Sequence, residues 1–444
     1  MPVGAPLKHR FLFAAHPTVG HTAALRAIGG RLREQHHDVA FALGVVRLPR
    51  WFPQPEAART AAALPAAIEA DGLDVVALKP AWSSLKYAAQ IGSRTGLHEL
   101  GTALQLFTAG LPDQARQIAA AIVARDVDVV VADYLLPAAF LGAALAKKPC
   151  IALYHSALPF PAEGAPPFGT IGVLDDEQRR AAEATLRDLG AAYDHRVDLA
   201  TRALGLPALH SGLLTRPMST TLNLLATTPA LEPGLLPLPG PVLLCGPCLP
   251  RARAADVDDP ALHAFTAADA TRAVARVYVS LGTVFNTQPA IFERLIAGLF
   301  HDADHANDVV VSAGASITAL AKHARPGLHL FARVPQVALL EQADVVITHG
   351  GNNTVQECLR AGRPMIVVPF GGDQRANARR VERLGVGVVL MPDRLTPAAI
   401  AAAVRAVRRP DVVAKSRAIA DDLVDVDGAD VAATAILRTV AGIA

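Results

Sequence analysis

Short apolar runs recur along the chain, and each is bounded by charged residues, glycine or proline. In the first half they lie at residues 9–16, 37–44, 73–79, 127–133 and 149–156. Between them run longer segments whose apolar residues have helical spacing, for example residues 22–35 and 111–126. Short runs rich in valine, alanine and leucine are typical of strands buried on both faces. Their alternation with helices predicts a parallel sheet covered by helices.

The same alternation restarts in the second half, at residues 276–283, 307–314, 328–334, 344–351, 364–370 and 387–391. The proline-rich segment 231–260 between the halves opposes both helices and central strands. We therefore predict an α/β protein with two doubly wound domains, residues 1–235 and 261–425, and a linker at 236–260. The last segment, 426–444, is a helix that could pack back on the first domain. Ligands of such sheets bind beyond the carboxyl ends of the strands, which predicts a cleft between the domains.

Composition and charge exclude several classes of function. Hydrophobic residues make up 52% of the 444 residues, and 42 Lys and Arg balance 40 Asp and Glu, so no large basic field indicates a nucleic acid partner. No apolar run reaches the roughly 18 residues of a membrane-spanning helix, and the chain begins without a signal peptide, so we expect a cytoplasmic protein with no integral membrane segment. Cys245 and Cys248 form a C-x-x-C without a second pair, which favours reduced structural thiols over zinc.

The segment THGGNNTVQECLRAGRPMIVVPFGGDQ, residues 348–374, carries the densest set of polar groups. A strand there runs into a glycine turn, and a helix follows that begins at Asn353 or Thr354. A helix start offers unpaired amides and a partial positive charge to a phosphate, and His349 could add a donor. Thr354 and Glu357 also have the spacing of a capping box, so local sequence leaves their role open.

Two further loops follow strands of the second half. The glycine turn at 280–283 offers Ser280, Gly282 and Thr283 to a phosphate. Asp373 and Gln374 follow the run at 364–370, where they suit adjacent sugar hydroxyls. Alternatively, Asp373 is only the cap of the next helix.

Together these residues resemble the signature of family 1, UDP-dependent glycosyltransferases of GT-B fold, of the bacterial natural-product and macrolide type. The likeness covers nearly the whole chain, and its most specific part is residues 333–374, where RVPQVALL, THGGNNTVQE and PFGGDQ follow in the family's order and spacing. The resemblance implies two Rossmann-like domains facing across a cleft. It also favours ligand contact over capping for Thr354 and Glu357.

The resemblance further implies which residues bind the donor. They are Ser280 and Thr283 at the phosphate-side turn, Arg333 at the nucleobase, Gln336 at base and ribose, His349 at the diphosphate, Asn353 and Thr354 at phosphate, Glu357 at ribose hydroxyls, and Asp373 and Gln374 at the transferred sugar, with Val334 and Gly351 completing the set.

The sequence departs from the family at two positions. Arg333 stands where the family usually has a tryptophan that stacks on the base, and Asn352 stands where plant members have another tryptophan. A guanidinium is planar and can also stack on a base. The donor is therefore a UDP-sugar or a dTDP-sugar, and the sequence does not choose between them.

The acceptor hydroxyl needs a base, and two histidines, His16 and His21, follow the first strand. The resemblance selects His21 as the base and Asp133, at the end of the run 127–133, as the carboxylate that orients it. Asp133 also suits a turn or a helix cap. For His16 we favour a structural role.

The expected reaction is a single inverting displacement without a metal or other cofactor, with hexose, most simply glucose, as the transferred group. The D-x-D triplets at 126–128 and 425–427 are interpreted as solvated charge rather than as metal ligands. Loops at 47–60, 80–100 and 155–169 mix aromatic residues and proline with few charges, which suits a lipophilic hydroxylated acceptor as well as a cover for the sheet edge. Two alternatives are an epimerase or hydrolase of GT-B fold and a non-catalytic nucleotide-sugar binding protein.

Overall fold

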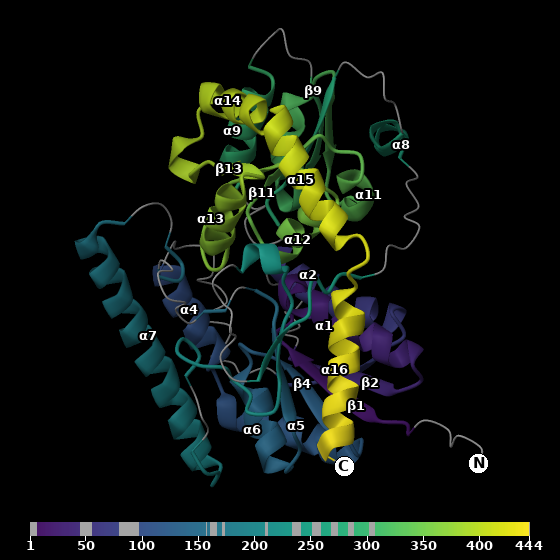
Figure 1. Ribbon diagram of the computed structural model, residues 1–444, viewed down its shortest axis with the longest axis vertical. Coiled ribbons are helices and arrows are strands. Elements are labelled where there is room, and N and C mark those ends of the chain that lie inside the picture. The colour runs from purple at the N-terminus through teal and green to yellow at the C-terminus, as the bar shows by residue number, and fades with distance from the viewer. Residues whose placement is uncertain are drawn as a thin grey trace.

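A computed structural model of the chain describes residues 7–44, 56–79, 97–156, 158–159, 167–170, 174–208, 212–232, 241–250, 259–267, 274–282, 288–301 and 307–443. Within these ranges the chain forms two α/β domains, one above the other along the long axis of the molecule (Figure 1). Each domain has one sheet, and all the strand pairs in the described ranges are parallel.

The sheet of the first domain has the strand order β3-β2-β1-β4-β5-β6-β7. Its strands are β1 Arg10–Ala15, β2 Asp38–Leu43, β3 Asp74–Ala77, β4 Val129–Asp133, β5 Cys150–Tyr154, β6 Asn223–Leu225 and β7 Val242–Leu244. The direction of winding reverses between β1 and β4, and such a switch point opens a crevice at the carboxyl ends of the two strands.

Alternating side chains of β1 enter two different cores. Leu12 and Ala14 face one side, and Phe11 and Phe13 face the other. The first side is covered by α4 Leu97–Phe107, α5 Leu111–Ala124, α6 Pro137–Leu145 and α7 Asp176–Ala203, and the second by α1 Val19–Glu34 and α2 Glu56–Ala70. This period of two along a strand buried on both faces is what the continuous apolar runs predict.

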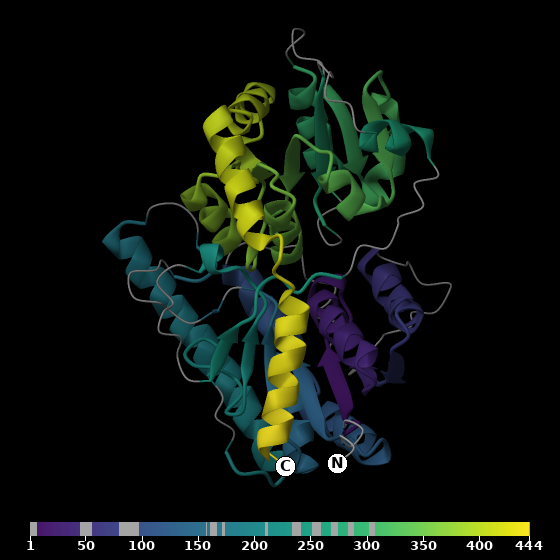
Figure 2. The ribbon, with the colours of Figure 1, turned by 45° about the vertical axis from the view of Figure 1, so that its right-hand side comes forward.

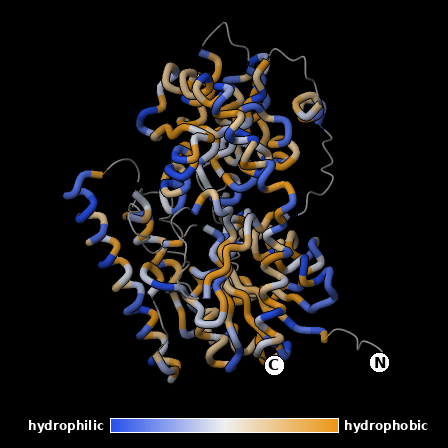
Figure 3. Tube along the Cα trace, in the orientation of Figure 1, coloured by the Kyte–Doolittle hydropathy of each residue, from blue (hydrophilic) through white to orange (hydrophobic). Residues whose placement is uncertain are grey.

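The sheet of the second domain has the order β10-β9-β8-β11-β12-β13. Its strands are β8 Ala275–Ser280, β9 Asn307–Ser312, β10 Leu328–Phe331, β11 Val345–Thr348, β12 Met365–Val367 and β13 Gly387–Val389. Its helices are α8 Pro260–Thr266, α9 Pro289–Leu299, α10 Ile317–Leu320, α11 Gln336–Leu340, α12 Asn352–Arg360, α13 Gln374–Leu384, α14 Pro397–Val407 and α15 Pro410–Leu423. Figure 3 shows hydrophobic residues along the strands and hydrophilic residues at the outer turns.

These sheets confirm the predicted class of two doubly wound α/β domains, and each of the eleven predicted runs overlaps a strand. The predicted linker 236–260 needs a correction, because it contains β7, which pairs with β6 in the first sheet. Both strands have three residues and were not predicted. β7 is the edge strand of the sheet. Prolines next to an edge strand are tolerated, because no hydrogen bonds between central strands are lost.

The last helix, α16 Gly428–Ile443, returns from the second domain to the first and packs beside α1 (Figures 1 and 2). Its Ala429, Ala432 and Ile436 are buried in the same core as Phe13 of β1. No helix within the described ranges is long and apolar enough to cross a membrane.

Asp427, just before α16, corrects the interpretation of the triplet 425–427 as merely solvated charge. Its Oδ2 accepts a hydrogen bond from Nη2 of Arg31 at 2.8 Å, and the Arg31 side chain is only 5% exposed. This ion pair therefore ties the crossover between the domains to α1. In the other triplet, Asp126 is largely exposed and pairs with Arg10, as solvated charge does.

Candidate active site

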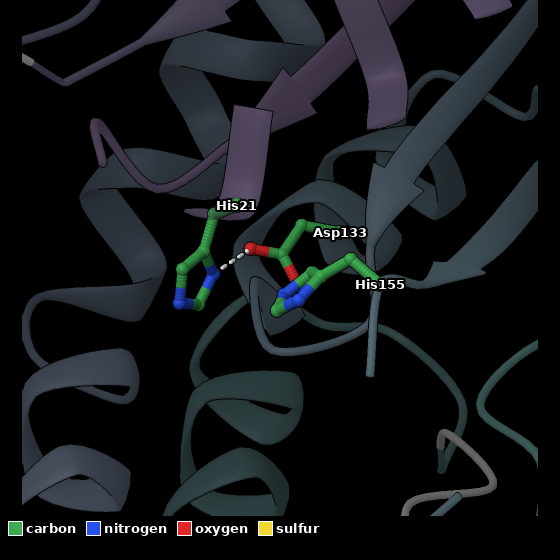
Figure 4. Close-up of side chains that lie close together, drawn as sticks. All are labelled: His21, Asp133 and His155. Atoms are coloured by element: carbon green, nitrogen blue, oxygen red, sulfur yellow. Dashed lines mark hydrogen bonds and ion pairs between the residues drawn. The ribbon is translucent and has the colours of Figure 1, made fainter. Parts of the chain in front are cut away.

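Two neighbouring strands of the first sheet bring His21 and Asp133 together. His21 lies in the first turn of α1, directly after β1, and Asp133 is the last residue of β4, which pairs with β1. Parallel strands end at the same edge, so the two side chains meet: Nδ1 of His21 and Oδ2 of Asp133 are 2.5 Å apart (Figure 4). The Asp133 side chain is fully buried, whereas that of His21 is 18% exposed. One nitrogen of the His21 imidazole therefore contacts the carboxylate, while part of the ring remains exposed to solvent.

The charge of Asp133 determines the tautomer of His21. Burial alone would raise the pKa of Asp133, but the adjacent His21 and His155 hold this pKa well below its usual range. An ionised carboxylate only accepts hydrogen bonds, so Nδ1 of His21 must donate. In the neutral imidazole Nε2 is then the unprotonated nitrogen, which is the atom that a general base uses.

A third residue, His155, completes the cluster and was missed as a site residue in the sequence, where it lies in the predicted acceptor loop 155–169. It follows β5, the strand next to β4. Its Nε2 is 3.3 Å from Oδ1 of Asp133, and its ring centre is 4.3 Å from that of His21 (Figure 4). The available signal was its place directly after a predicted strand of the same sheet, where ligand-facing residues gather.

The three side chains are also close enough for metal ligands, with one ligand atom from each lying within 4.8 Å of the others in the described part of the chain. Hydrogen bonding explains the arrangement of these three side chains better than metal coordination does. Two ligand atoms that share a zinc ion are more than ~3 Å apart, since each bond is about 2.0–2.2 Å long. The 2.5 Å between His21 and Asp133 is a hydrogen-bond distance, and the backbone N–H of Leu135 donates to the other carboxylate oxygen. We therefore assign no ion to the cluster.

His16 occupies the structural position expected for it, beside the cluster. Its Nε2 is 3.1 Å from the carbonyl oxygen of Leu135, and its ring centre is 4.5 Å from that of Phe107. Burial lowers the pKa of His16 to about 4, so the ring is neutral and its Nε2–H donates to the carbonyl. This nitrogen is therefore engaged by the backbone and is not offered to a substrate.

The predicted donor site has two glycine turns, at the ends of β8 and β11, and these two strands pair with each other. His349 follows β11, and a Cβ added to Gly282 after β8 would lie 2.7 Å from its ring. Gly282 also has a φ of 71°, which other residues rarely adopt. Ser280 is buried at the end of β8, and Thr283 lies outside the described residues. The structure thus brings His349 against the predicted phosphate turn.

Burial lowers the pKa of His349 to about 4, so this residue is a neutral imidazole. It can offer a hydrogen bond to a phosphate but no positive charge.

α12 begins at Asn352, one residue earlier than the sequence indicates, and Gly351 is its N-cap without a side-chain cap bond. The alternative that Thr354 and Glu357 form a capping box is therefore wrong.

Instead, Nε2 of Gln336 donates to Oγ1 of Thr354 at 3.2 Å and to the carboxyl group of Glu357. Oε1 of Gln336 accepts from the Tyr278 hydroxyl at 2.9 Å. Burial raises the pKa of Glu357 to about 7. These residues form one polar network beside the helix start.

The first turn of α12 also contacts the first domain. Nδ2 of Asn352 donates to the backbone carbonyl of His155 at 2.7 Å, and Nδ2 of Asn353 donates to that of Gly20 at 3.4 Å. Asn352 therefore joins the domains at a position where plant members of the family have tryptophan. The predicted phosphate helix lies directly over the first turn of α1, which carries His21, and over the segment after β5, which carries His155.

Arg333, predicted at the nucleobase, contacts the first domain. Its Nη2 donates to Oγ1 of Thr60 in α2 at 3.1 Å, while the adjacent Val334 packs against the core of the second domain. The guanidinium is thus held between the two domains. Most of the predicted acceptor loops, including residues 47–55 and 80–96, lie outside the described residues.

Asp373 and Gln374 lie at the start of α13. Asp373 is the N-cap residue of α13, as the alternative interpretation expects, but its side chain makes no cap bond; its Oδ2 accepts from Nδ2 of Asn377 at 3.2 Å. Burial raises the pKa of Asp373, against the opposing charges of His155 and His21. Asp373 therefore lies within electrostatic reach of the histidine cluster. Gln374 instead uses Oε1 to accept the backbone N–H of Phe370 at 2.9 Å.

The second domain is similar in sequence to a known family domain. Residues 297–436 match the family model described as Erythromycin biosynthesis protein CIII-like, C-terminal domain. The NDP-glycosyltransferase YjiC of Bacillus subtilis is 33% identical over 160 residues, which cover 36% of this chain and 40% of the relative. The oleandomycin glycosyltransferase of Streptomyces antibioticus is 34% identical over 121 residues, 27% of this chain and 28% of the relative. The matched segments thus span less than half the length of these relatives.

Solved structures match over nearly the whole chain. The glycotransferase of kitacinnamycin has a TM-score of 0.72 at 23% identity and covers 98% of this chain and 100% of its own. The calicheamicin glycosyltransferase CalG4 has a TM-score of 0.66 at 22% identity and covers 99% and 100%. The two parallel sheets and these structural matches therefore define a protein of GT-B architecture. The predicted resemblance to bacterial natural-product glycosyltransferases of family 1 is confirmed, and residues 297–436 match the EryCIII-like C-terminal domain.

Proposed function

We propose that this protein is an inverting glycosyltransferase that moves a hexose, most simply glucose, from a nucleoside diphosphate sugar to a hydroxyl of a lipophilic small molecule. The observation that carries the proposal is the His21–Asp133 pair, 2.5 Å apart, at the edge of the first sheet that α12 of the second domain covers. Similarity to bacterial relatives supports the class, including a second Bacillus subtilis protein, the uncharacterized UDP-glucosyltransferase YojK, which is 31% identical over 166 residues.

On the acceptor side, Nε2 of His21 takes the proton of the acceptor hydroxyl as its oxygen attacks the anomeric carbon. The proton that Nδ1 already carries stays on the ring and faces Asp133. The carboxylate stabilises the imidazolium that forms, and it holds the ring in the required tautomer. A positioned general base of this kind contributes about 10²- to 10⁴-fold to a rate.

On the donor side, the nucleoside diphosphate leaves as an anion. The amides at the start of α12 and their partial positive charge are suited to receive it, and His349 supplies one more neutral donor. The attacking oxygen comes from the first domain and the leaving group departs to the second. The two groups therefore lie on opposite faces of the anomeric carbon, which is the geometry of a single displacement with inversion.

In this proposal the network of Gln336, Thr354 and Glu357 binds the ribose and phosphate of the donor, and Arg333 lies against its base; their mutual hydrogen bonds support this role. Asp373 is the proposed partner of hydroxyls on the transferred sugar. The proposed donor is a UDP-sugar or a dTDP-sugar. Two structural neighbours, SsfS6 at 18% identity and the spinosyn rhamnosyltransferase SpnG at 17%, were solved as complexes with thymidine diphosphate.

The first experiment measures nucleoside diphosphate release, with mass detection of products. UDP-glucose and dTDP-glucose are tested against phenols, flavonoids and macrolides with the wild type and His21→Ala. The control is His329→Ala, because His329 pairs with Asp308 at 2.9 Å in the second domain. We expect a glycoside from the wild type and control but almost none from His21→Ala. Release without acceptor would instead support an epimerase or hydrolase, and donor binding without any release would support a binding protein.

A further inference from the structure

The carboxylate of Asp133 is shared between two histidines, whereas the proposed reaction uses only one of them. Oδ2 faces Nδ1 of His21 at 2.5 Å, and Oδ1 faces Nε2 of His155 at 3.3 Å. The His155 side chain is only 10% exposed, so water screens this contact weakly. The backbone of His155 is held in turn by Asn352 of α12.

We propose that His155 is a positioning residue that acts as an imidazolium: it shares the Asp133 carboxylate with His21 and opposes a second positive charge beside it. This inference rests on the proposed function, because it concerns the electrostatic surroundings of the base in that reaction. His155 itself is not required to touch the acceptor.

The charged and titratable groups around His155 come from each element packed against it. They are Asp133 of β4, Tyr134 after it, His21 of α1, His16 after β1 and Asp373 at the start of α13. Tyr134 is neutral, since burial raises the pKa of its hydroxyl far above the ordinary value, and His16 is neutral as well. The two carboxylates therefore dominate the field at His155.

The balance of these groups supports a charged ring. Burial lowers the pKa of His155, but the carboxylate of Asp133, aided by that of Asp373, more than compensates, so the pKa is raised above its ordinary value of 6.5. The two carboxylates come from different domains, and the contact of Asn352 with the His155 backbone holds these domains together. The positive charge on His155 thus depends on both domains being packed together.

A positive charge on His155 affects His21 in two ways, and both act in the same direction. It repels the imidazolium of His21, whose ring centre is 4.3 Å away, and it neutralises part of the Asp133 charge that would attract that imidazolium. Both effects disfavour a second positive charge in the cluster. Removing the charge on His155 should therefore move the acidic limb of the pH–activity profile to higher pH.

The test is the pH dependence of kcat/KM for the wild type and His155→Gln. The acidic limb reports the loss of activity as the base becomes protonated. We expect this limb to move to higher pH by about one unit or more in His155→Gln, as a unit charge at this separation implies with an effective dielectric constant near 20. A merely structural role would lower the rate but leave the limb in place, which would overturn the proposal.

The control is His329→Gln, which removes a histidine from a His–Asp pair in the second domain and should leave the limb unchanged. A substrate-free measurement is NMR titration of ¹³C-labelled histidine rings in the wild type and Asp133→Asn. We expect His155 to titrate above 6.5 in the wild type and below it in Asp133→Asn. Titration of wild-type His155 below 6.5 would overturn the proposal even if transfer is observed, and the expected titration without transfer would contradict the proposed function alone.

Discussion

Replacing Asp133 by asparagine tests the proposed base most directly, because it removes one charge with little change of shape. Asp133 is fully buried and lies 2.5 Å from Nδ1 of His21. In the reaction His21 becomes positive, and the neutral amide no longer stabilises that charge. The amide nitrogen of asparagine can also donate to Nδ1, which would place the ring proton on Nε2 and block the base.

The magnitude follows from the geometry. With about 4 Å between the charge centres and an effective dielectric constant near 20, the lost attraction is ~4 kcal/mol. Because about 1.4 kcal/mol corresponds to a tenfold change in rate, we expect kcat to fall by about 10³-fold. Donor affinity should change little, since the donor network lies in the second domain.

The assay is nucleoside diphosphate release at saturating donor and acceptor, with donor affinity measured by calorimetry. Asp308→Asn is the matched control, because it removes the carboxylate of another His–Asp pair. Thermal unfolding should show that both variants are folded. A kcat for Asp133→Asn close to that of the wild type would refute the reasoning and remove Asp133 from the proposed mechanism.

Four further outcomes are expected. Gly282→Ala should weaken donor binding at least tenfold in calorimetry, because its Cβ would enter the His349 ring at 2.7 Å and its φ is 71°; unchanged affinity would separate this turn from the phosphate site. Burial raises the pKa of Glu357 to about 7, so its carboxylate, the better hydrogen-bond acceptor, forms only as pH rises through 7. Donor affinity should therefore increase severalfold from pH 6 to 8, and Glu357→Gln should remove this dependence. Asp373→Ala should reduce discrimination among donor hexoses in competition assays, and unchanged preference would exclude it from the sugar site. Asn352→Ala should cost about 1–3 kcal/mol in urea unfolding, as it leaves a buried carbonyl of His155 without its partner; equal stability would contradict a joining role between the domains.

Local sequence was sufficient for most of the fold. The apolar runs at 9–16 and 127–133 became β1 and β4, since strands buried on both faces need continuous hydrophobic residues whatever their neighbours are. β6 and β7 could not be found in this way. Each has three residues, and only pairing within the sheet makes them strands.

For the candidate site, too, some residues could be found from local sequence and others only from contacts between distant parts of the chain. Motif order, read through the family resemblance, indicated His21, Asp133 and the donor helix, because those residues follow strands or begin a helix that can be recognised locally. The alternative roles of Thr354 and Glu357 could not be decided locally, because the deciding partner, Gln336, lies in another helix.

The two parallel-sheet domains, and the kinds of side chain at the ends of their strands, follow from local sequence. Which of those side chains meet depends on the three-dimensional fold. The place of β5 beside β4 puts His155 on the second oxygen of Asp133, and the packing of the domains puts Asn352 on the His155 backbone. The physical reason is that strand order and domain packing bring together residues far apart in the chain, and the field of a buried carboxylate depends on those neighbours.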